Sequence, residues 1–247
     1  MVVIRSLLFN LGVALCTLVM TACLPYLMIR RDSARVRRFS RAWSGFLRAW
    51  LRLTIGLSDR EVHAERKPAG PALYVCNHQS VWETLFFNLL IPDVAIVLKE
   101  ELLSIPVFGW FLRNSPMIPL NRHAGASAMR NLIRDARKAI SEGRSVLIFP
   151  EGTRRGAYSD ADFKVGAAAL YSALGVPIVP VALTSGLFWE NGSFLKYGGT
   201  IDVSYLEPIA PAGRAQDVLK DAQKKIYQER DRLVKDHDID IWALACG

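Results

Sequence analysis

The chain has 247 residues, of which 51% are hydrophobic, and it carries a formal net charge of +8. This length fits one domain, or one domain with an appended membrane segment, and the charge favours an anionic partner. The four cysteines form no Cys-x-x-Cys pair and no cluster with histidine. This argues against a zinc site and a disulfide framework, and we expect no metal.

The N-terminal part of the chain is strongly apolar. Residues 6–29 contain no charge and are rich in Leu, Val and Ala. A helix of this length can cross a hydrocarbon core of about 30 Å, so we expect a membrane-embedded helix. A cleaved signal peptide is an alternative, because residues 20–23 loosely resemble a lipoprotein cleavage site, although the apolar run continues beyond them. A buried core helix is a further alternative.

An arginine-rich segment follows, and residues 35–53 form two faces when placed on a helix. One face is apolar, with Phe39, Trp43, Phe46, Trp50 and Leu53, and with Leu47 and Val36 at its edge. The opposite face is basic, with Arg37, Arg38, Arg41, Arg48 and Arg52. This pattern is typical of an interfacial helix on an anionic membrane. An ordinary core-facing helix is the alternative. Because these arginines share a helix with aromatic residues, we expect lipid rather than nucleic acid as the partner.

The distribution of arginines also predicts an orientation. The excess after the apolar run, against only Arg5 before it, places the rest of the chain in the cytoplasm. We therefore expect a protein of the cell inner membrane whose catalytic part faces the cytoplasm.

From about residue 60 the sequence alternates between strands and helices. Strands are predicted at 72–76, 94–98, 145–149, 177–184 and 201–206, with a short extended segment at 116–120, and helices at 81–90, 124–142, 165–174 and 216–236. This alternation predicts an α/β fold with a largely parallel mixed sheet flanked by helices. We divide the chain into membrane-anchoring helices at residues 1–58 and an α/β domain at residues 59–247.

A candidate base follows the first of these strands. His78 comes after Asn77 at the strand end, and Glu83 lies five positions further on. A neutral imidazole can take a proton from a hydroxyl, and a carboxylate on its other nitrogen would fix the tautomer. Positions five apart on one helix point in different directions, so His78 must lie in the turn before the helix. The alternative is that these residues only cap the helix.

A candidate anion site follows the strand at 145–149. Gly152 allows a tight turn that a ligand can approach, Thr153 can donate a hydrogen bond, and the planar fork of Arg154 suits phosphate oxygens. Glu151 precedes them. Both motifs follow strand ends, where open α/β sheets bind their ligands. An ordinary loop with surface arginines is the alternative.

Two further cations are candidates for the same site. Arg122 follows the extended segment at 116–120, and Lys164 opens the helix at 165–174. A helix N-terminus with a lysine can bind an anion. A solvated loop and a surface charge are the alternatives for these two residues.

Together these motifs resemble the phospholipid/glycerol acyltransferases, and among them the bacterial 1-acylglycerol-3-phosphate (lysophosphatidic acid) acyltransferases. The resemblance covers roughly residues 55–210. Its blocks match His78 with Glu83, residues 119–122, residues 149–154 and residues 176–181, in that order. Aspartate is commoner in the family at the place of Glu83.

The resemblance implies a membrane-bound enzyme that moves an acyl group from acyl-CoA or acyl carrier protein to the free hydroxyl of lysophosphatidate, giving phosphatidic acid. His78, oriented by Glu83, would be the base, and no cofactor would be needed. The glycerol-phosphate site would comprise Arg122, Glu151, Gly152, Thr153 and Arg154, with Asn77 and Lys164 as possible additions. Anionic membrane lipids would be further partners.

Three other functions stay open. The chain could acylate another lyso-lipid, such as a lyso-ornithine lipid or a lysophospholipid. It could be a serine hydrolase using Ser80, although the sequence contains no Gly-x-Ser-x-Gly elbow. It could also be a non-enzymatic protein that binds anionic lipid through its arginine-rich helix.

Overall fold

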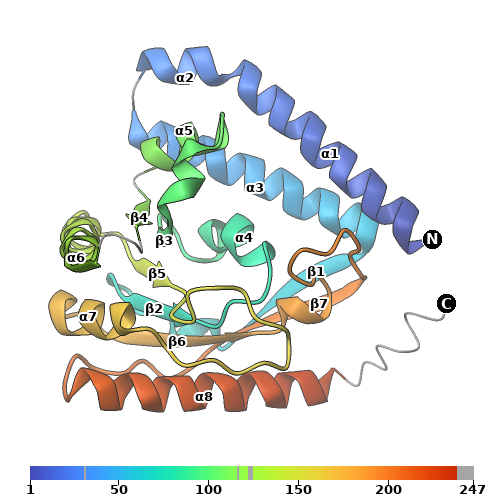
Figure 1. Cartoon of the computed structure of the whole chain (residues 1–247). Coiled ribbons are helices and arrows are strands. Elements are labelled where there is room, and N and C mark those ends of the chain that lie inside the picture. Colours follow the sequence, from blue (N-terminus) through green and yellow to red (C-terminus); the bar gives the residue numbers. More distant parts are fainter. Residues whose placement is uncertain (31, 116, 122–124, 238–247) are drawn as a thin grey trace.

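The computed structural model describes residues 1–30, 32–115, 117–121 and 125–237. Within these ranges a central sheet is covered by helices on both faces (Figure 1). The predicted α/β fold is therefore confirmed. Arg122 and residues 238–247 lie outside the described residues.

The described part of the chain forms one sheet of seven strands. They are β1 (Leu57–Val62), β2 (Leu73–Cys76), β3 (Ala95–Lys99), β4 (Ile118–Leu120), β5 (Val146–Ile148), β6 (Ile178–Leu183) and β7 (Gly199–Tyr205). Their spatial order is β1-β7-β6-β2-β5-β3-β4. Neighbouring strands are parallel except β6 and β7, which are antiparallel. The sheet is thus mixed and largely parallel, as predicted.

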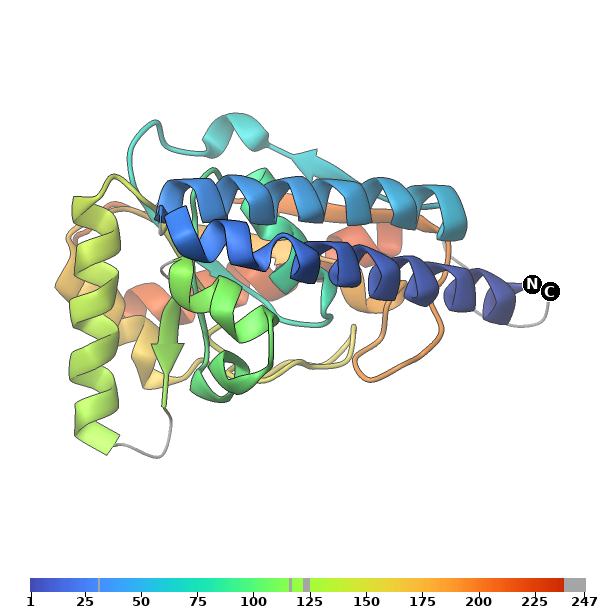
Figure 2. The same ribbon diagram turned by 90° about the horizontal axis from the view of Figure 1, so that it is seen from above.

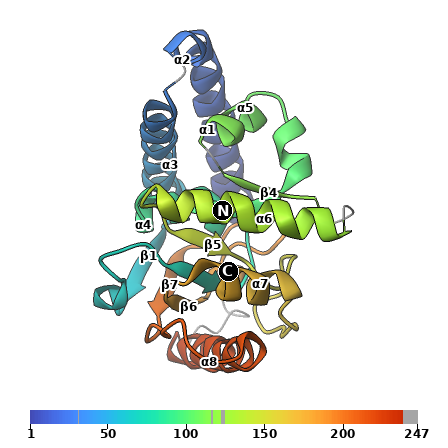
Figure 3. The same cartoon turned by 90° about the vertical axis from the view of Figure 1, so that its left-hand side faces the viewer.

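The helices of the described residues form two layers around this sheet. They are α1 (Val2–Ala22), α2 (Leu24–Arg30), α3 (Ser33–Ile55), α4 (Trp82–Leu90), α5 (Phe108–Asn114), α6 (Gly125–Ser141), α7 (Val165–Leu174) and α8 (Ala215–Asp236). Helices α6, α7 and α8 contribute to one core, and α1, α3 and α4 contribute to the other. Figure 3 shows α7 and α8 on the side of the sheet opposite α1 and α3.

The two cores follow from the alternation of side chains along each strand. In β2, Tyr74 and Cys76 pack among the residues of α3 and α4, whereas Leu73 and Val75 pack towards α6, α7 and α8. All four residues of β2 are buried. The sequence of this strand is therefore apolar throughout, as expected for a parallel strand that is covered on both faces.

The apolar N-terminal run forms a helix that is interrupted near its end. Helix α1 has a mean hydropathy of 2.1 and is long and apolar enough to cross a membrane, by length and composition. It ends at Ala22, and α2 begins at Leu24. Pro25 has no backbone N–H, so it can start a new helix but cannot continue the hydrogen bonds of α1. The predicted run of 6–29 is therefore two helices.

Helix α3 lies beside α1 (Figure 2) and also packs on the α/β domain. Its fully buried apolar residues are Val36, Leu47, Leu51 and Ile55. The sequence placed the apolar face along residues 39, 43, 46, 50 and 53, with Val36 and Leu47 only at its edge. That division of faces was partly wrong, because α3 is covered from two sides, by α1 and by α4. Phe46 and Leu53 remain 52% and 76% exposed, and their contact with a membrane stays a prediction.

One arginine predicted on the basic face has a structural role. The Arg48 guanidinium donates to Asp59 of β1, with Nε 2.7 Å from Oδ1, and the Asp59 side chain is 2% exposed. This ion pair ties α3 to the sheet. Strand β1 itself begins two residues before the predicted boundary at residue 59, and the division into two domains stays a prediction.

Candidate active site

Both predicted motifs lie at the same edge of the sheet. Strands β2 and β5 are parallel neighbours, with Leu73 opposite Val146 and Val75 opposite Ile148. The segments that follow the carboxyl ends of these two strands therefore begin side by side. His78 follows β2, and Phe149 follows β5. The His78 ring stacks on the Phe149 ring with 4.1 Å between centroids and an angle of 18°, so the two motifs are in direct contact.

The predicted pairing of His78 and Glu83 is present. The Nδ1 atom of His78 lies 3.3 Å from Oε1 of Glu83. Helix α4 begins at Trp82, so His78 lies in the turn before the helix and Glu83 in its first turn. This is the arrangement that the five-residue spacing required. The His78 side chain is 12% exposed, and the Glu83 side chain is fully buried.

The same carboxylate is held by backbone amides at the helix N-terminus. Oε1 of Glu83 accepts hydrogen bonds from the amides of Gln79 and Ser80, at 2.6 and 2.8 Å. These amides have no partner within the helix, and a negative charge at this position is favourable. Glu83 therefore both caps α4 and orients His78, which combines the two interpretations that the sequence left open.

The loop of the second motif is held in place by a contact on its interior side. Glu151 is 2% exposed, and the hydroxyl of Tyr227 in α8 donates to its Oε1 at 3.1 Å. Burial raises the pKa of Glu151 to about 7, against the opposing effects of the Tyr227 hydroxyl and the His78 amide. Its carboxyl group faces the protein interior, and it is absent from the walls of the cavity described next. A direct contact between Glu151 and a substrate stays a prediction.

His78 lines a cavity of about 630 Å³ between β3, β5, α6 and α7. Gly152, Thr153 and Arg154 line it, together with the lysines Lys99 and Lys164. No aspartate or glutamate of the described residues lines this cavity. We name it the basic cavity, and its charges suit an anionic ligand.

The Arg154 side chain reaches from the second motif to the turn of the first. Its Nε donates to the carbonyl oxygen of Ser80 at 3.0 Å, and Nη1 donates to Oδ1 of Asn191 at 3.4 Å. These two bonds hold the guanidinium group close to the turn that carries His78. Its side chain is only partly buried, so it can still reach a ligand.

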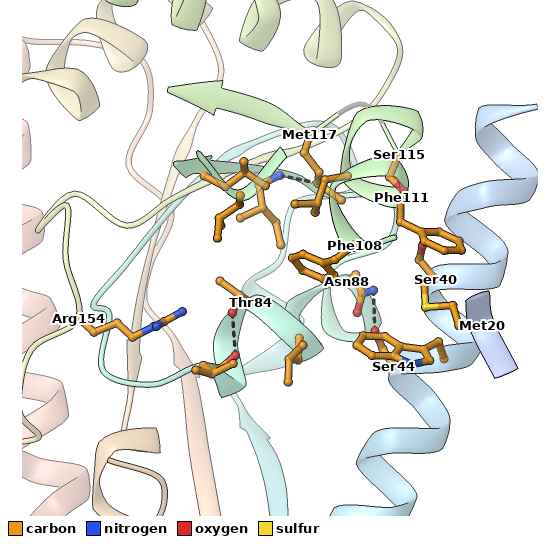
Figure 4. Close-up of a pocket in the computed structure, with 17 residues that line it drawn as sticks. Met20, Ser40, Ser44, Thr84, Asn88, Phe108, Phe111, Ser115, Met117 and Arg154 are labelled. Atoms are coloured by element: carbon orange, nitrogen blue, oxygen red, sulfur yellow. Dashed lines mark hydrogen bonds between the residues drawn. The ribbon is translucent and has the colours of Figure 1, made fainter. Parts of the chain in front are cut away.

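A second, smaller cavity of about 220 Å³ leads away from this point towards the N-terminal helices (Figure 4). Four residues line both cavities, namely Thr84, Leu98, Leu102 and Arg154. Most of its other walls are apolar and come from α3, α4, α5 and the end of α1, including Met20, Leu85, Phe108, Phe111 and Leu112. We name it the apolar cavity. Its walls suit a hydrocarbon chain.

Comparison with known proteins connects this geometry to a family. An acyltransferase family profile matches residues 59–184, which include both motifs. The chain belongs to the acyltransferase family. It is 35% identical to the 1-acyl-sn-glycerol-3-phosphate acyltransferase of Pseudomonas aeruginosa over 74% of this chain and 70% of that protein. It is 30% identical to the enzyme of that name from Limnanthes alba over 68% of this chain and 60% of that protein.

The fold of this acyltransferase also matches a solved structure. The crystal structure of the 1-acyl-sn-glycerophosphate (LPA) acyltransferase PlsC from Thermotoga maritima superimposes with a TM-score of 0.69 at 20% identity, covering 91% of this chain and 97% of that one. The overall arrangement of sheet and helices is therefore shared with that protein.

Not every predicted site residue of this acyltransferase lies at the basic cavity. Asn77 is buried, and its side-chain amide bonds to both backbone groups of Leu183, at 2.9 and 3.0 Å. It thus joins the ends of β2 and β6, which is a structural role. Lys164 does line the basic cavity, at the start of α7. Arg122 lies outside the described residues, and its role stays a prediction.

Sequence reasoning missed three residues of this acyltransferase that the structure brings to the site. Lys99 lines the basic cavity at the end of β3, Asn191 holds Arg154, and Tyr227 holds Glu151. Lys99 follows a clear strand and could have been found by the same rule as the two motifs. Asn191 and Tyr227 lie in a loop and a polar helix, where the sequence gives no comparable signal.

No metal site is evident in the described part of this acyltransferase. Among those residues, no group of three or more His, Cys, Asp or Glu side chains could hold a metal ion. The expectation that the enzyme needs no cofactor stays a prediction.

Proposed function

We propose that this acyltransferase moves a fatty acyl group from an acyl thioester, acyl-CoA or acyl carrier protein, to the free hydroxyl of 1-acylglycerol-3-phosphate. The product would be phosphatidic acid. One observation supports the proposal most strongly. The Nδ1 atom of His78 lies 3.3 Å from the buried Glu83 carboxylate, and His78 lines a cavity that Lys99, Arg154 and Lys164 also line. The names of the Pseudomonas and Limnanthes relatives support the choice of acceptor.

The proton transfer follows from the orientation of the imidazole. With Nδ1 towards Glu83, a proton on Nδ1 leaves the lone pair of Nε2 for the acceptor hydroxyl. The imidazole takes that proton as the hydroxyl oxygen attacks the thioester carbonyl. The tetrahedral intermediate then expels the thiolate, which takes the proton from the imidazolium. The buried Glu83 carboxylate stabilises the imidazolium in between, and no acyl-enzyme forms.

The phosphate of the acceptor would bind among the cations of the basic cavity. Arg154 offers a planar fork to phosphate oxygens. Thr153 also lines this cavity, as does Gly166 in the first turn of α7. Backbone amides at the start of a helix favour a bound anion. These groups would orient the glycerol so that its hydroxyl reaches His78.

The N-terminal helices would place this site at a membrane surface. Leu11, Leu15 and Leu18 of α1 are exposed and lie along one side of the helix. Lipid contact would cover them. With the arginine-rich α3 on an anionic leaflet, we propose that the α/β domain faces the cytoplasm at the inner membrane, and that nucleic acid is not a ligand.

An acceptor panel tests this function. Purified full-length protein in mixed micelles is given lysophosphatidate, a lysophospholipid without a terminal phosphate, or a lyso-ornithine lipid, with acyl-CoA and acyl carrier protein as donors. We expect lysophosphatidate to be the best acceptor by at least tenfold in kcat/KM. Equal or better transfer to an acceptor without a terminal phosphate would contradict the proposal.

Arg154→Ala tests the phosphate site within the same assay. We expect the KM for lysophosphatidate to rise about tenfold or more, because a charge-assisted bond is worth about 1.5–3 kcal/mol, while kcat changes little. Arg134→Ala, which alters an exposed arginine of α6, is the control and should leave both constants unchanged. An unaltered KM in Arg154→Ala would place the phosphate elsewhere.

A further inference from the structure

A lysine outside the basic cavity is buried without a charged partner. Lys196 is 4% exposed and belongs to residues 184–198, which we name the β6–β7 loop. Its Nζ atom donates to the carbonyl oxygen of Phe194 at 2.9 Å. This atom also lies over the rings of Phe9, Trp189 and Phe194, at 5.5, 4.7 and 5.7 Å from their centroids. Burial lowers the pKa of Lys196, and no carboxylate of the described residues offsets this effect. Because lysine is rarely buried without an ion pair, a specific role is indicated.

Lys196 joins the β6–β7 loop to α1. Its backbone amide donates to Oγ of Ser6 at 3.0 Å, and Ser6 is fully buried. About one turn further along α1, the Phe9 ring meets the Trp189 ring edge-on, with 5.5 Å between centroids. Figure 1 shows the loop, in orange, between β7 and the N-terminal half of α1. We name Ser6, Phe9, Trp189 and Lys196 the lysine clasp.

The tip of the same loop reaches the basic cavity. Asn191 lines that cavity, and its Oδ1 accepts from Nη1 of Arg154 at 3.4 Å. Asn191 lies in a tight turn, which the amide of Ser193 closes by donating to the carbonyl of Glu190 at 3.2 Å. Gly192 follows with a φ of +79°, a conformation that glycine adopts without strain. The turn is therefore fixed locally, and its placement decides where the Asn191 side chain meets Arg154.

The lysine clasp determines where this turn lies. Trp189 is two residues before Asn191, and Lys196 is five residues after it. The amide of Tyr197 donates to the carbonyl of Phe188 at 2.9 Å, so the two ends of this segment are joined. Both loop residues of the clasp lie within the closed segment, on either side of the turn. A displacement of the clasp is therefore passed on to Asn191.

Given the proposed function, we propose that Lys196 is a positioning residue that acts through Asn191 on Arg154. The Nε atom of Arg154 donates to the carbonyl of Ser80 and Nη1 donates to Asn191, and neither bond uses Nη2. Because two points of the planar guanidinium group are held, its orientation is set before the acceptor binds, and Nη2 is left for the phosphate. Such preorganisation reduces the entropy lost on binding. Through the clasp, α1 thus contributes to binding of the acceptor phosphate.

Lys196→Met in the full-length protein tests the proposal. Methionine keeps much of the length and apolar character of the lysine stem but lacks the ammonium group. We expect the KM for lysophosphatidate to rise about three- to tenfold, the effect of one hydrogen bond that is no longer held in place. The kcat and the KM for the acyl donor should stay nearly unchanged. If Lys196 only fastens α1 to the domain, Tm falls while the KM for lysophosphatidate keeps its parent value, and that result would overturn the inference.

Lys67→Met is the matched control. The Lys67 ammonium group also lies over an aromatic ring, 4.9 Å from the centroid of Tyr205, and also donates to a backbone carbonyl, that of Leu90, at 3.2 Å. Lys67 lines neither the basic cavity nor the apolar cavity. This variant should lower Tm without changing the KM for lysophosphatidate. An equal rise of the KM in Lys67→Met and Lys196→Met would contradict the proposed role of Lys196.

A double-variant cycle checks that Lys196 acts through Asn191. Asn191→Ala alone should raise the KM for lysophosphatidate, and adding Lys196→Met should raise it no further, because the effects of residues that act through one another are not additive. Fold-changes that multiply in the double variant would refute this route. Phe9→Leu takes the place of Lys196→Met if that variant does not fold, since it removes one ring beside the ammonium group but keeps an apolar side chain. It should raise the KM in the parent protein but not in Asn191→Ala.

Binding of sn-glycerol 3-phosphate separates this inference from the proposed function. If the parent protein does not acylate lysophosphatidate, that result counts against the proposed function alone. Calorimetric titration of the parent protein and of Lys196→Met with sn-glycerol 3-phosphate then decides the inference. We expect the Kd of the parent protein to be about three- to tenfold lower than that of the variant. Equal Kd values would show that Lys196 does not position the phosphate site.

Discussion

Two buried carboxylates flank His78, and they are held in different ways. Glu83 approaches the imidazole ring and accepts from two backbone amides of its own helix start. Glu151 lies near the backbone of His78 and accepts from Tyr227 in the distant helix α8. The pair of His78 and Glu83 is therefore built locally, within six residues, whereas the loop at residues 149–154 depends on the C-terminal part of the fold. Changes at each carboxylate should have correspondingly different effects.

Among changes at the two carboxylates and their partners, the largest effect is expected from Glu83→Gln. A neutral amide cannot stabilise the imidazolium, and its NH2 group can bind the wrong tautomer of His78. We expect kcat to fall about 10²–10⁴-fold, with little change in the KM of either substrate. Steady-state kinetics with Glu101→Gln, an exposed glutamate, as the control would check this. A variant with the kcat of the parent protein would show that Glu83 only caps α4.

Glu151→Gln should change stability in a pH-dependent way. The folded pKa of Glu151 is about 7 against an ordinary value of 4.5, so the folded state favours its protonated form. That contribution to stability is fully present below about pH 4.5 and is lost as pH rises through 7. The difference corresponds to on the order of 3 kcal/mol.

Because glutamine stays neutral, the Tm of Glu151→Gln relative to the parent protein should rise from pH 5 to pH 8 and then level off. Thermal unfolding across this range is the measurement. A constant difference in Tm would mean that Glu151 is ionised throughout and that the two carboxylates differ less than their surroundings indicate.

A smaller effect is expected from Tyr227→Phe. It removes the phenol that bonds to Glu151 and to the backbone of Ala161, which should destabilise the fold by about 1–2 kcal/mol. Because the loop then loses its support, the KM for lysophosphatidate should rise several-fold with kcat nearly unchanged.

Tyr171→Phe is a matched control for this change. Its hydroxyl also bonds to backbone carbonyls, at Ala210 and Ala212, but neither residue belongs to the loop at residues 149–154. It should lower Tm without changing the KM. If both variants altered the KM equally, the link from α8 to the loop would be refuted.

The elements around the site were predictable because their patterns are strong. Strands β2 and β5 are short apolar runs that end at the motifs, and α4 and α7 begin within a residue of the expected positions. Strand β1 was missed, since its sequence is Leu-Ser-Asp-Arg-Glu-Val and it pairs with β7 at the edge of the sheet. Such a polar edge strand carries little hydrophobic signal.

In the candidate site, too, the local contact was predictable and the long-range contact was not. The pairing of His78 with Glu83 followed from spacing and the position of a helix start. The bond from Tyr227 to Glu151 spans 76 residues, and only the packing of α8 against the loop creates it. The buried face of α3 could not be predicted from the sequence either, since the helix carries apolar residues on several sides and its neighbours decide which of them are buried.

The most direct measurement is the rate of acyl transfer to lysophosphatidate by full-length His78→Ala. We expect kcat to fall at least 100-fold, because a positioned general base contributes about 10²–10⁴-fold, while Tm and the KM for lysophosphatidate stay close to those of the parent protein. A variant that folds and retains more than about a tenth of the parent activity would contradict the assignment of His78 as the base.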